Sequence, residues 1–111
     1  EEARMWLDKA IKECPYLRDP LTERMILEYN LKNYKESIKY GKKALSIKTR
    51  TYTYINNPNS YNETIYDIMS INYYMEGNIK EGLKYINKAL KISPNNKRIQ
   101  NNKKFFVKDI N

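Results

Sequence analysis

The sequence predicts an all-α fold of stacked helix pairs, with about six helices in its 111 residues. The main observation is an internal repeat. Segments 18–51 and 63–96 are each 34 residues long and align position by position once residues 52–62 between them are treated as an insertion. This repeat length is typical of a helix–turn–helix unit. Apolar residues recur at the spacing of one helix face, and turn-forming Gly, Asn and Pro fall between the expected helices. The expected helices lie at about 2–14, 19–31, 34–48, 62–76, 79–92 and 95–108.

The first helix corresponds to the second half of a truncated repeat, residues 1–17. Ala3 and Ala10 occupy the small positions of that half, and Pro15 occupies the position that ends it. Because the chain opens inside this amphipathic run without an initiator Met, we expect it to be part of a longer protein. Cys14 is expected to be a small buried residue.

Residues 18–51 form a less regular repeat. Its first helix places Arg24 and Glu28 where apolar residues are expected. Other apolar residues of that helix still recur at helical spacing, namely Leu21, Met25, Ile26 and Tyr29. The second helix keeps small residues where the two helices would cross, namely Ser37 and Ala44, and it has Gly41 at the position that Ile86 occupies in the next repeat.

Residues 52–62 form an insertion between the two repeats, and its Asn56-Asn57-Pro58-Asn59 stretch indicates a turn. Its tyrosines are Tyr52, Tyr54 and Tyr61. They could stack on a sugar or on bases, or they could fold back over the groove and fill a gap between repeats. We favour the second interpretation, because a loop of this length needs its own anchors.

The best-formed repeat is 63–96. Small residues stand where its helices would cross and large ones stand beside them. The small residues are Ser70, Gly82 and Ala89. The large ones are Tyr66, Tyr73 and Ile86, and Met69 is a further apolar residue of the first helix. Gly77-Asn78 supplies the turn, and Pro94 ends the second helix. Gly82 should cost about 1 kcal/mol of helix propensity relative to Ala.

Residues 97–111 predict a C-terminal capping helix. Its sequence is mostly polar, as the outer face of the last helix in a repeat array must be. Ile99, Phe105 and Phe106 are expected to face inward.

Segment 63–96 resembles the tetratricopeptide repeat (TPR) over its full length, which implies a short right-handed TPR-like α-α solenoid. Most of the chain is also similar to the C-terminal accessory repeats of TPR-containing glycosyltransferases. The similarity lies in the segments ECPYLRDP, KNYKESIKYGKKALSIKTRTYTYINNPNSYNETIYDIMSINYYMEGN and NKRIQNNKKFF, in Tyr66-Asp67, and in Asn101, Asn102 and Phe105. It implies a parent protein that transfers sugar from a nucleotide sugar. This chain would be its non-catalytic module for acceptor or partner recognition, or for self-association.

No catalytic residue carries over from that family, because its Asp-x-Asp metal motif does not occur in the chain. The sequence has no His and a single Cys, so it lacks the commonest general base and cannot form an internal disulfide. We therefore expect no enzymatic activity, no cofactor and no metal site. No membrane span or signal-peptide pattern is visible, and we expect cytoplasmic localisation.

Repeats of this family bind partners through a concave face built from the first helix of each pair. The resemblance implies these contact residues: Thr22, Ile26, Tyr29, Asn30, Asp67, Ile71 and Tyr74. The partner would be a protein or peptide, the parent's upstream domain, or a second copy of the chain. Equally, these residues could simply pack against a neighbouring element. Members that clamp a chaperone's C-terminal carboxylate carry Lys and Asn where this chain has Thr22 and Ile26, so clamp function is not expected.

The formal net charge of +8 raises the possibility of nucleic-acid binding. Two observations weaken it: residues encoded by A/T-rich codons are abundant, and the lysines follow the second helices, where a solvated face is expected. These are Lys35, Lys39, Lys42, Lys43, Lys80, Lys84, Lys88 and Lys91. The alternatives to an accessory module are a stand-alone TPR peptide-binding scaffold and, with less support, a basic module that binds RNA or single-stranded DNA.

Overall fold

The computed structural model describes residues 2–47 and 63–110, with side chains described as far as residue 108. The described residues form six α-helices and no strand, which confirms the all-α prediction. The helices are α1 (Glu2–Glu13), α2 (Arg18–Asn30), α3 (Tyr34–Ser46), α4 (Thr64–Met75), α5 (Ile79–Ile92) and α6 (Lys97–Ile110). No expected boundary differs from these by more than two residues. The insertion 52–62, with Tyr52, Tyr54 and Tyr61, lies outside the described residues.

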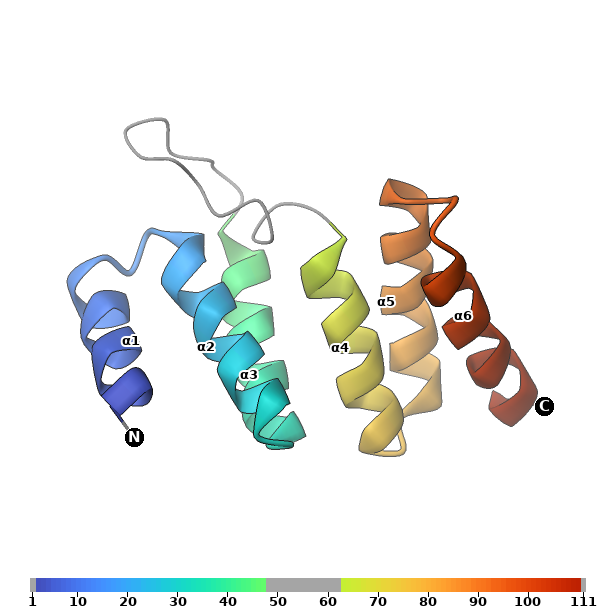
Figure 1. Ribbon diagram of the computed structural model, residues 1–111, viewed down its shortest axis with the longest axis horizontal. Helices are drawn as coiled ribbons and strands as arrows, with labels where there is room; N and C mark the ends of the chain where they lie inside the picture. Colours follow the sequence, from blue (N-terminus) through green and yellow to red (C-terminus); the bar gives the residue numbers. More distant parts are fainter. Residues whose placement is uncertain (1, 48–62, 111) are drawn as a thin grey trace.

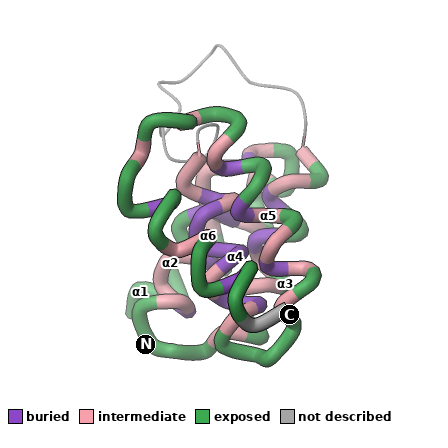
Figure 2. Tube along the Cα trace, turned by 90° about the vertical axis from the view of Figure 1, so that its right-hand side faces the viewer, coloured by how far each residue is buried: buried purple, intermediate pink, exposed green. Residues whose placement is uncertain are grey.

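Each helix packs against its neighbours along the chain, and α2 also contacts α4. The helices stand side by side in a row, with α1 and α6 at opposite ends (Figure 1). In that view α2, α4 and α6 lie on the near side and α3 and α5 lie behind them. We call the near side the α2/α4/α6 face. Figure 2 shows the buried residues gathered between these two layers.

The two central hairpins, α2–α3 and α4–α5, turn in the same way. Lys32 and Gly77 hold the same position of the repeat, and both have a left-handed backbone, with φ of 63° and 81°. The next residue, Asn33 or Asn78, donates its backbone N–H to the carbonyl five residues earlier, at 2.8 Å in both hairpins. This hydrogen bond satisfies a carbonyl that the helix end would leave unpaired.

Two asparagines set the starts of the last helices. The Asn78 side chain accepts a hydrogen bond from the Glu81 backbone N–H at 3.4 Å. The Asn96 side chain accepts one from the Ile99 backbone N–H at 3.1 Å. Such caps satisfy a free N–H of the first turn, and the Asn96 cap explains why α6 begins at Lys97 instead of residue 95.

Two glycines, Gly41 on α3 and Gly82 on α5, permit close packing inside the core. A Cβ at Gly82 would lie 2.3 Å from Cε1 of Phe106, and one at Gly41 would lie 2.3 Å from Sδ of Met69. Because Gly82 has no side chain, the Phe106 ring packs directly on the α5 backbone. This packing offsets the helix propensity that glycine loses relative to alanine. The two hairpins are also joined by a buried polar contact, because the amide of Asn72 donates to the Ser37 hydroxyl at 2.8 Å.

Two expectations about single side chains are wrong. Phe105 is 59% exposed, while Ile99 and Phe106 are buried. Consecutive helical residues point about 100° apart, so Phe105 and Phe106 cannot both face the same core. Cys14 is half-buried and not fully enclosed. By contrast, the eight lysines expected to be solvated on α3 and α5 are all exposed.

Candidate functional site

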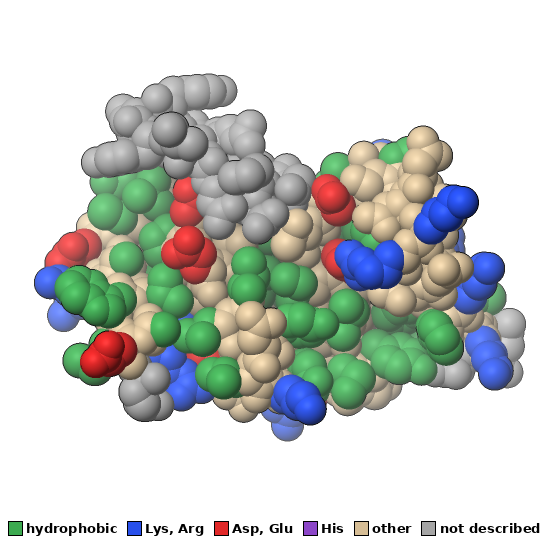
Figure 3. Space-filling model, in the orientation of Figure 1, with side chains coloured by type: hydrophobic (Ala, Val, Ile, Leu, Met, Phe, Trp, Pro, Cys, Tyr) green, Lys and Arg blue, Asp and Glu red, His purple; other side chains and the backbone are tan. Residues whose placement is uncertain are grey.

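Five of the predicted contact residues reach the surface of the α2/α4/α6 face. Ile26 and Tyr29 on α2, and Ile71 and Tyr74 on α4, are half-buried, and Asn30 is exposed. Figure 3 shows hydrophobic side chains running as a band across this side of the molecule. Ile26, Tyr29, Ile71 and Tyr74 therefore leave apolar surface partly accessible on this face.

The other two predicted contact residues are buried. Thr22 donates its hydroxyl to the carbonyl of Arg18 at 3.2 Å, so it satisfies its own helix and does not contribute to the surface. Asp67 forms a two-pronged ion pair with Arg98 of α6. The hydrogen bond to Asp67 raises the pKa of Arg98, which keeps the guanidinium charged. Burial and then the nearby Asp67 carboxylate raise the pKa of Tyr29.

A pocket of about 340 Å³ opens between α4 and α6. It is lined by Ile71, Tyr74, Asn102, Phe105 and Phe106. The Tyr74 and Phe106 rings meet edge to face, with centroids 5.2 Å apart and planes at 71°. This is a favourable aromatic geometry that holds the back wall of the pocket. The site therefore has apolar walls and one amide group, the usual composition of a small binding pocket.

Sequence reasoning found only the α4 half of this pocket. It treated α6 as a cap and did not place Asn102 or Phe105 at a binding surface. A signal was available, because Asn102, Phe105 and Phe106 are spaced i, i+3 and i+4 and so share one face of a helix. What the single sequence did not reveal is that this face would border Ile71 and Tyr74.

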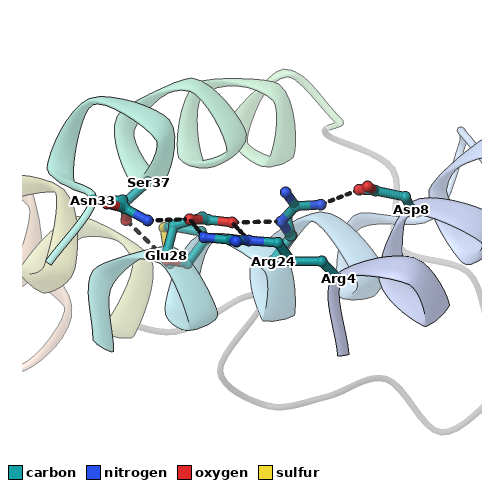
Figure 4. A network of polar contacts seen from close by, with 7 residues as sticks. Arg4, Asp8, Arg24, Glu28, Asn33 and Ser37 are labelled. Carbon is teal, nitrogen blue, oxygen red and sulfur yellow. Dashed lines mark hydrogen bonds and ion pairs between the residues drawn. The ribbon is translucent and has the colours of Figure 1, made fainter. Parts of the chain in front are cut away.

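A second feature that the sequence did not predict is a partly buried charge network between α1 and α2 (Figure 4). The Glu28 carboxylate accepts hydrogen bonds from Nε and Nη2 of Arg4 at 2.8 and 2.9 Å. It also accepts from Nε of Arg24 at 2.8 Å and from the amide of Asn33 at 2.9 Å. Arg24 in turn pairs with Asp8 of α1. Arg24 and Glu28 are thus charged residues at core positions, each with its partners.

This network fastens α1 to the remaining helices. No residue of α1 is fully buried, so the ion pairs of Arg4 and Asp8 supplement the packing of the half-buried Ile11 on the core. The hydrogen bonds from Arg4, and then those from Asn33 and Arg24, lower the pKa of Glu28 from 4.5 to about 2. At neutral pH Glu28 is therefore fully ionised and enclosed, which suits a structural ion pair and not a proton-transfer group.

Within residues 2–47 and 63–108, no group of His, Cys, Asp and Glu is arranged to hold a metal ion. None of the described helices is both long and apolar enough to cross a membrane. No protein-family model matches the chain, and a search of curated proteins found no match.

Proposed function

We propose that this chain is a non-catalytic interaction module that binds a protein or peptide partner across the α2/α4/α6 face. The observation that carries the proposal is the pocket formed by Ile71, Tyr74, Asn102, Phe105 and Phe106. It is apolar and open to solvent, and the half-buried Ile26 and Tyr29 lie on α2, which belongs to the same face. Apolar grooves between helices are a common way to bind an extended or helical peptide.

The same proposal includes a right-handed TPR-type solenoid as the architecture. Three features support it: the two hairpins share their turn geometry, consecutive helices pack in chain order, and equivalent crossing positions are buried. Ser37 and Gly82 occupy one such position, and Ala44 and Ala89 occupy another. Stacked helix pairs of this kind bury a continuous core and leave one face for partners.

We also propose that the module has no catalytic activity of its own and that it belongs to a nucleotide-sugar-dependent glycosyltransferase. The buried carboxylates Glu28 and Asp67 are both held by arginines, which supports the first part. The second part rests on the sequence resemblance. It is tested by reading the coding sequence upstream of Glu1. A catalytic domain with an Asp-x-Asp motif is expected there, and its absence would contradict this part and leave the interaction module untouched.

Peptide binding is tested by selecting phage-displayed random peptides on the immobilised protein. The selected peptides are then measured against two variants. Phe105→Ser removes an exposed wall of the pocket, and Ile92→Ser removes a comparably exposed apolar side chain of α5 outside it. We expect binding to be lost with Phe105→Ser and retained with Ile92→Ser. Failure to select any binder, or equal binding to both variants, would refute the proposal.

A further inference from the structure

The positive charge of the chain is concentrated at the α5–α6 end. Residues 79–111 contain nine Lys and Arg residues against two Asp and Glu residues, whereas residues 1–78 contain twelve against eleven. Nearly all of the net charge of +8 therefore lies in the last third of the chain. Codon composition would add lysine throughout the sequence and does not explain this separation, so the basic end needs a structural or functional reason.

The lysines of α6 have no acidic partner among the described residues. No described carboxylate pairs with Lys103, Lys104 or Lys108. Lys104 and Lys108 are exposed one helical turn apart, and the exposed Phe105 is the neighbour of Lys104 in sequence. These lysines, with Gln100 and Val107, line a second hollow of about 350 Å³ on the outer flank of α6. Lysines at this spacing, with no pairing carboxylate among the described residues, form a ready site for carboxylates.

The apolar pocket lies on the opposite flank of the same helix. Phe105 borders it and also stands between Lys104 and Lys108 in the sequence. Within the pocket, the Asn102 amide makes no hydrogen bond with any described residue. An amide offers both donors and an acceptor, which match the C=O and N–H of a peptide backbone. A peptide that places one side chain in the pocket and crosses α6 over Phe105 would bring its following residues close to Lys104 and Lys108.

From this arrangement we infer that the pocket takes a large apolar side chain of an acidic peptide, whose carboxylates bind Lys104 and Lys108. The inference rests on the proposed function and specifies the class of partner. A concave pocket with a free amide suits a peptide better than a lipid surface, which protruding side chains enter. Positive potential around the pocket would speed the encounter with an acidic peptide and disfavour a basic one.

The test uses short fluorescein-labelled peptides and fluorescence anisotropy at low ionic strength. One peptide carries a central Trp flanked by glutamates, a second replaces the glutamates by lysines, and a third replaces the Trp by Ser. We expect the Trp–Glu peptide to bind at least about tenfold more tightly than either of the others. The affinity should fall as salt is added, because exposed charge pairs are screened.

Charge-reversal variants locate the contact. Lys104→Glu/Lys108→Glu should weaken binding of the Trp–Glu peptide by at least about tenfold. The control Lys80→Glu/Lys91→Glu makes the same change of net charge at exposed positions of α5, and it should change the affinity by less than about twofold. Equal effects of the two double variants would overturn the inference, because they would show a response to net charge alone.

The remaining outcomes separate this inference from the proposed function. Equal binding of the Trp–Glu and Trp–Lys peptides would overturn the acidic preference and leave peptide binding standing. Equal binding with and without Trp would overturn the role of the pocket. If the Trp–Glu peptide does not bind while phage-selected peptides do, only the acidic-peptide inference is refuted. If neither kind of peptide binds, the proposed function is refuted as well. Binding only to phosphatidylserine vesicles, or self-association on sedimentation, would also overturn the inference in favour of a lipid or a second copy.

Discussion

Replacing Glu28 by Gln should strongly destabilise the protein, because Glu28 is the anion at the centre of the α1–α2 charge network. Its side chain is 1% exposed, and it accepts hydrogen bonds from Arg4, Arg24 and Asn33. Gln keeps the size of the side chain and removes its charge. Arg24, itself 9% exposed at its side chain, would then keep Asp8 as its one ionic partner among the described residues.

The magnitude follows from the pKa of Glu28. The folded protein lowers it from 4.5 to about 2, which corresponds to about 3 kcal/mol of stabilisation by the ionised form. A carboxyl with a lowered pKa stabilises the fold above its unfolded pKa, and this contribution disappears as pH falls through the folded pKa. The wild type should thus exceed Glu28→Gln by about 3 kcal/mol at neutral pH. The difference should vanish between pH 4.5 and about 2.

Urea unfolding followed by far-ultraviolet circular dichroism measures this difference across the pH range. The matched control is Glu81→Gln, which removes an exposed carboxylate paired with Lys84 at 3.0 Å. It should cost less than about 0.5 kcal/mol, because exposed ion pairs contribute little. A loss below about 1 kcal/mol for Glu28→Gln at neutral pH would refute the reasoning. A gap between wild type and variant that does not change with pH would refute it as well.

Three further substitutions test the packing and the turns. Gly82→Ala should lower stability by about 1–2 kcal/mol, since a Cβ there would lie 2.3 Å from the buried Phe106 ring; a higher melting temperature would show that helix propensity wins instead. Lys32→Gly should raise stability by about 1 kcal/mol, because Lys32 has a φ of 63° and glycine adopts this region without strain. The reciprocal Gly77→Ala should lower stability by about 1 kcal/mol at a φ of 81°. A urea midpoint that falls for Lys32→Gly, or one that rises for Gly77→Ala, would contradict the corresponding prediction.

The helices were predictable from the sequence because their signals are local. Apolar periodicity, the Gly77-Asn78 turn and Pro94 all act within a few residues of the boundary that they set. The small side chains at Ser37 and Gly82 also identified the crossing positions correctly, since close helix contact leaves no room for larger ones. At these helix boundaries and crossing positions, the residues nearby in sequence were sufficient to predict the structure.

The candidate site was only half predictable, because its other half depends on contacts between distant helices. Asp67 was expected at the surface, but Arg98 lies 31 residues away in sequence and covers its carboxylate. In the sequence, Arg24 and Glu28 are charged residues at positions where the repeat has apolar ones. The structure explains them, because Arg4 and Asp8 of α1 form ion pairs with them. A single-helix pattern contains no information about such partners. The packing of α6 against α4 completes the pocket, and it too depends on contacts between helices that are far apart in sequence.

The central claim is that a partner binds in the pocket between α4 and α6. The most direct measurement is a methyl NMR experiment on the protein with a phage-selected peptide, recording nuclear Overhauser effects from the peptide's apolar anchor to isoleucine methyl groups. The pocket predicts contacts to Ile71, which lines it. Contacts to Ile92, on the exposed surface of α5, with none to Ile71 would contradict the claim.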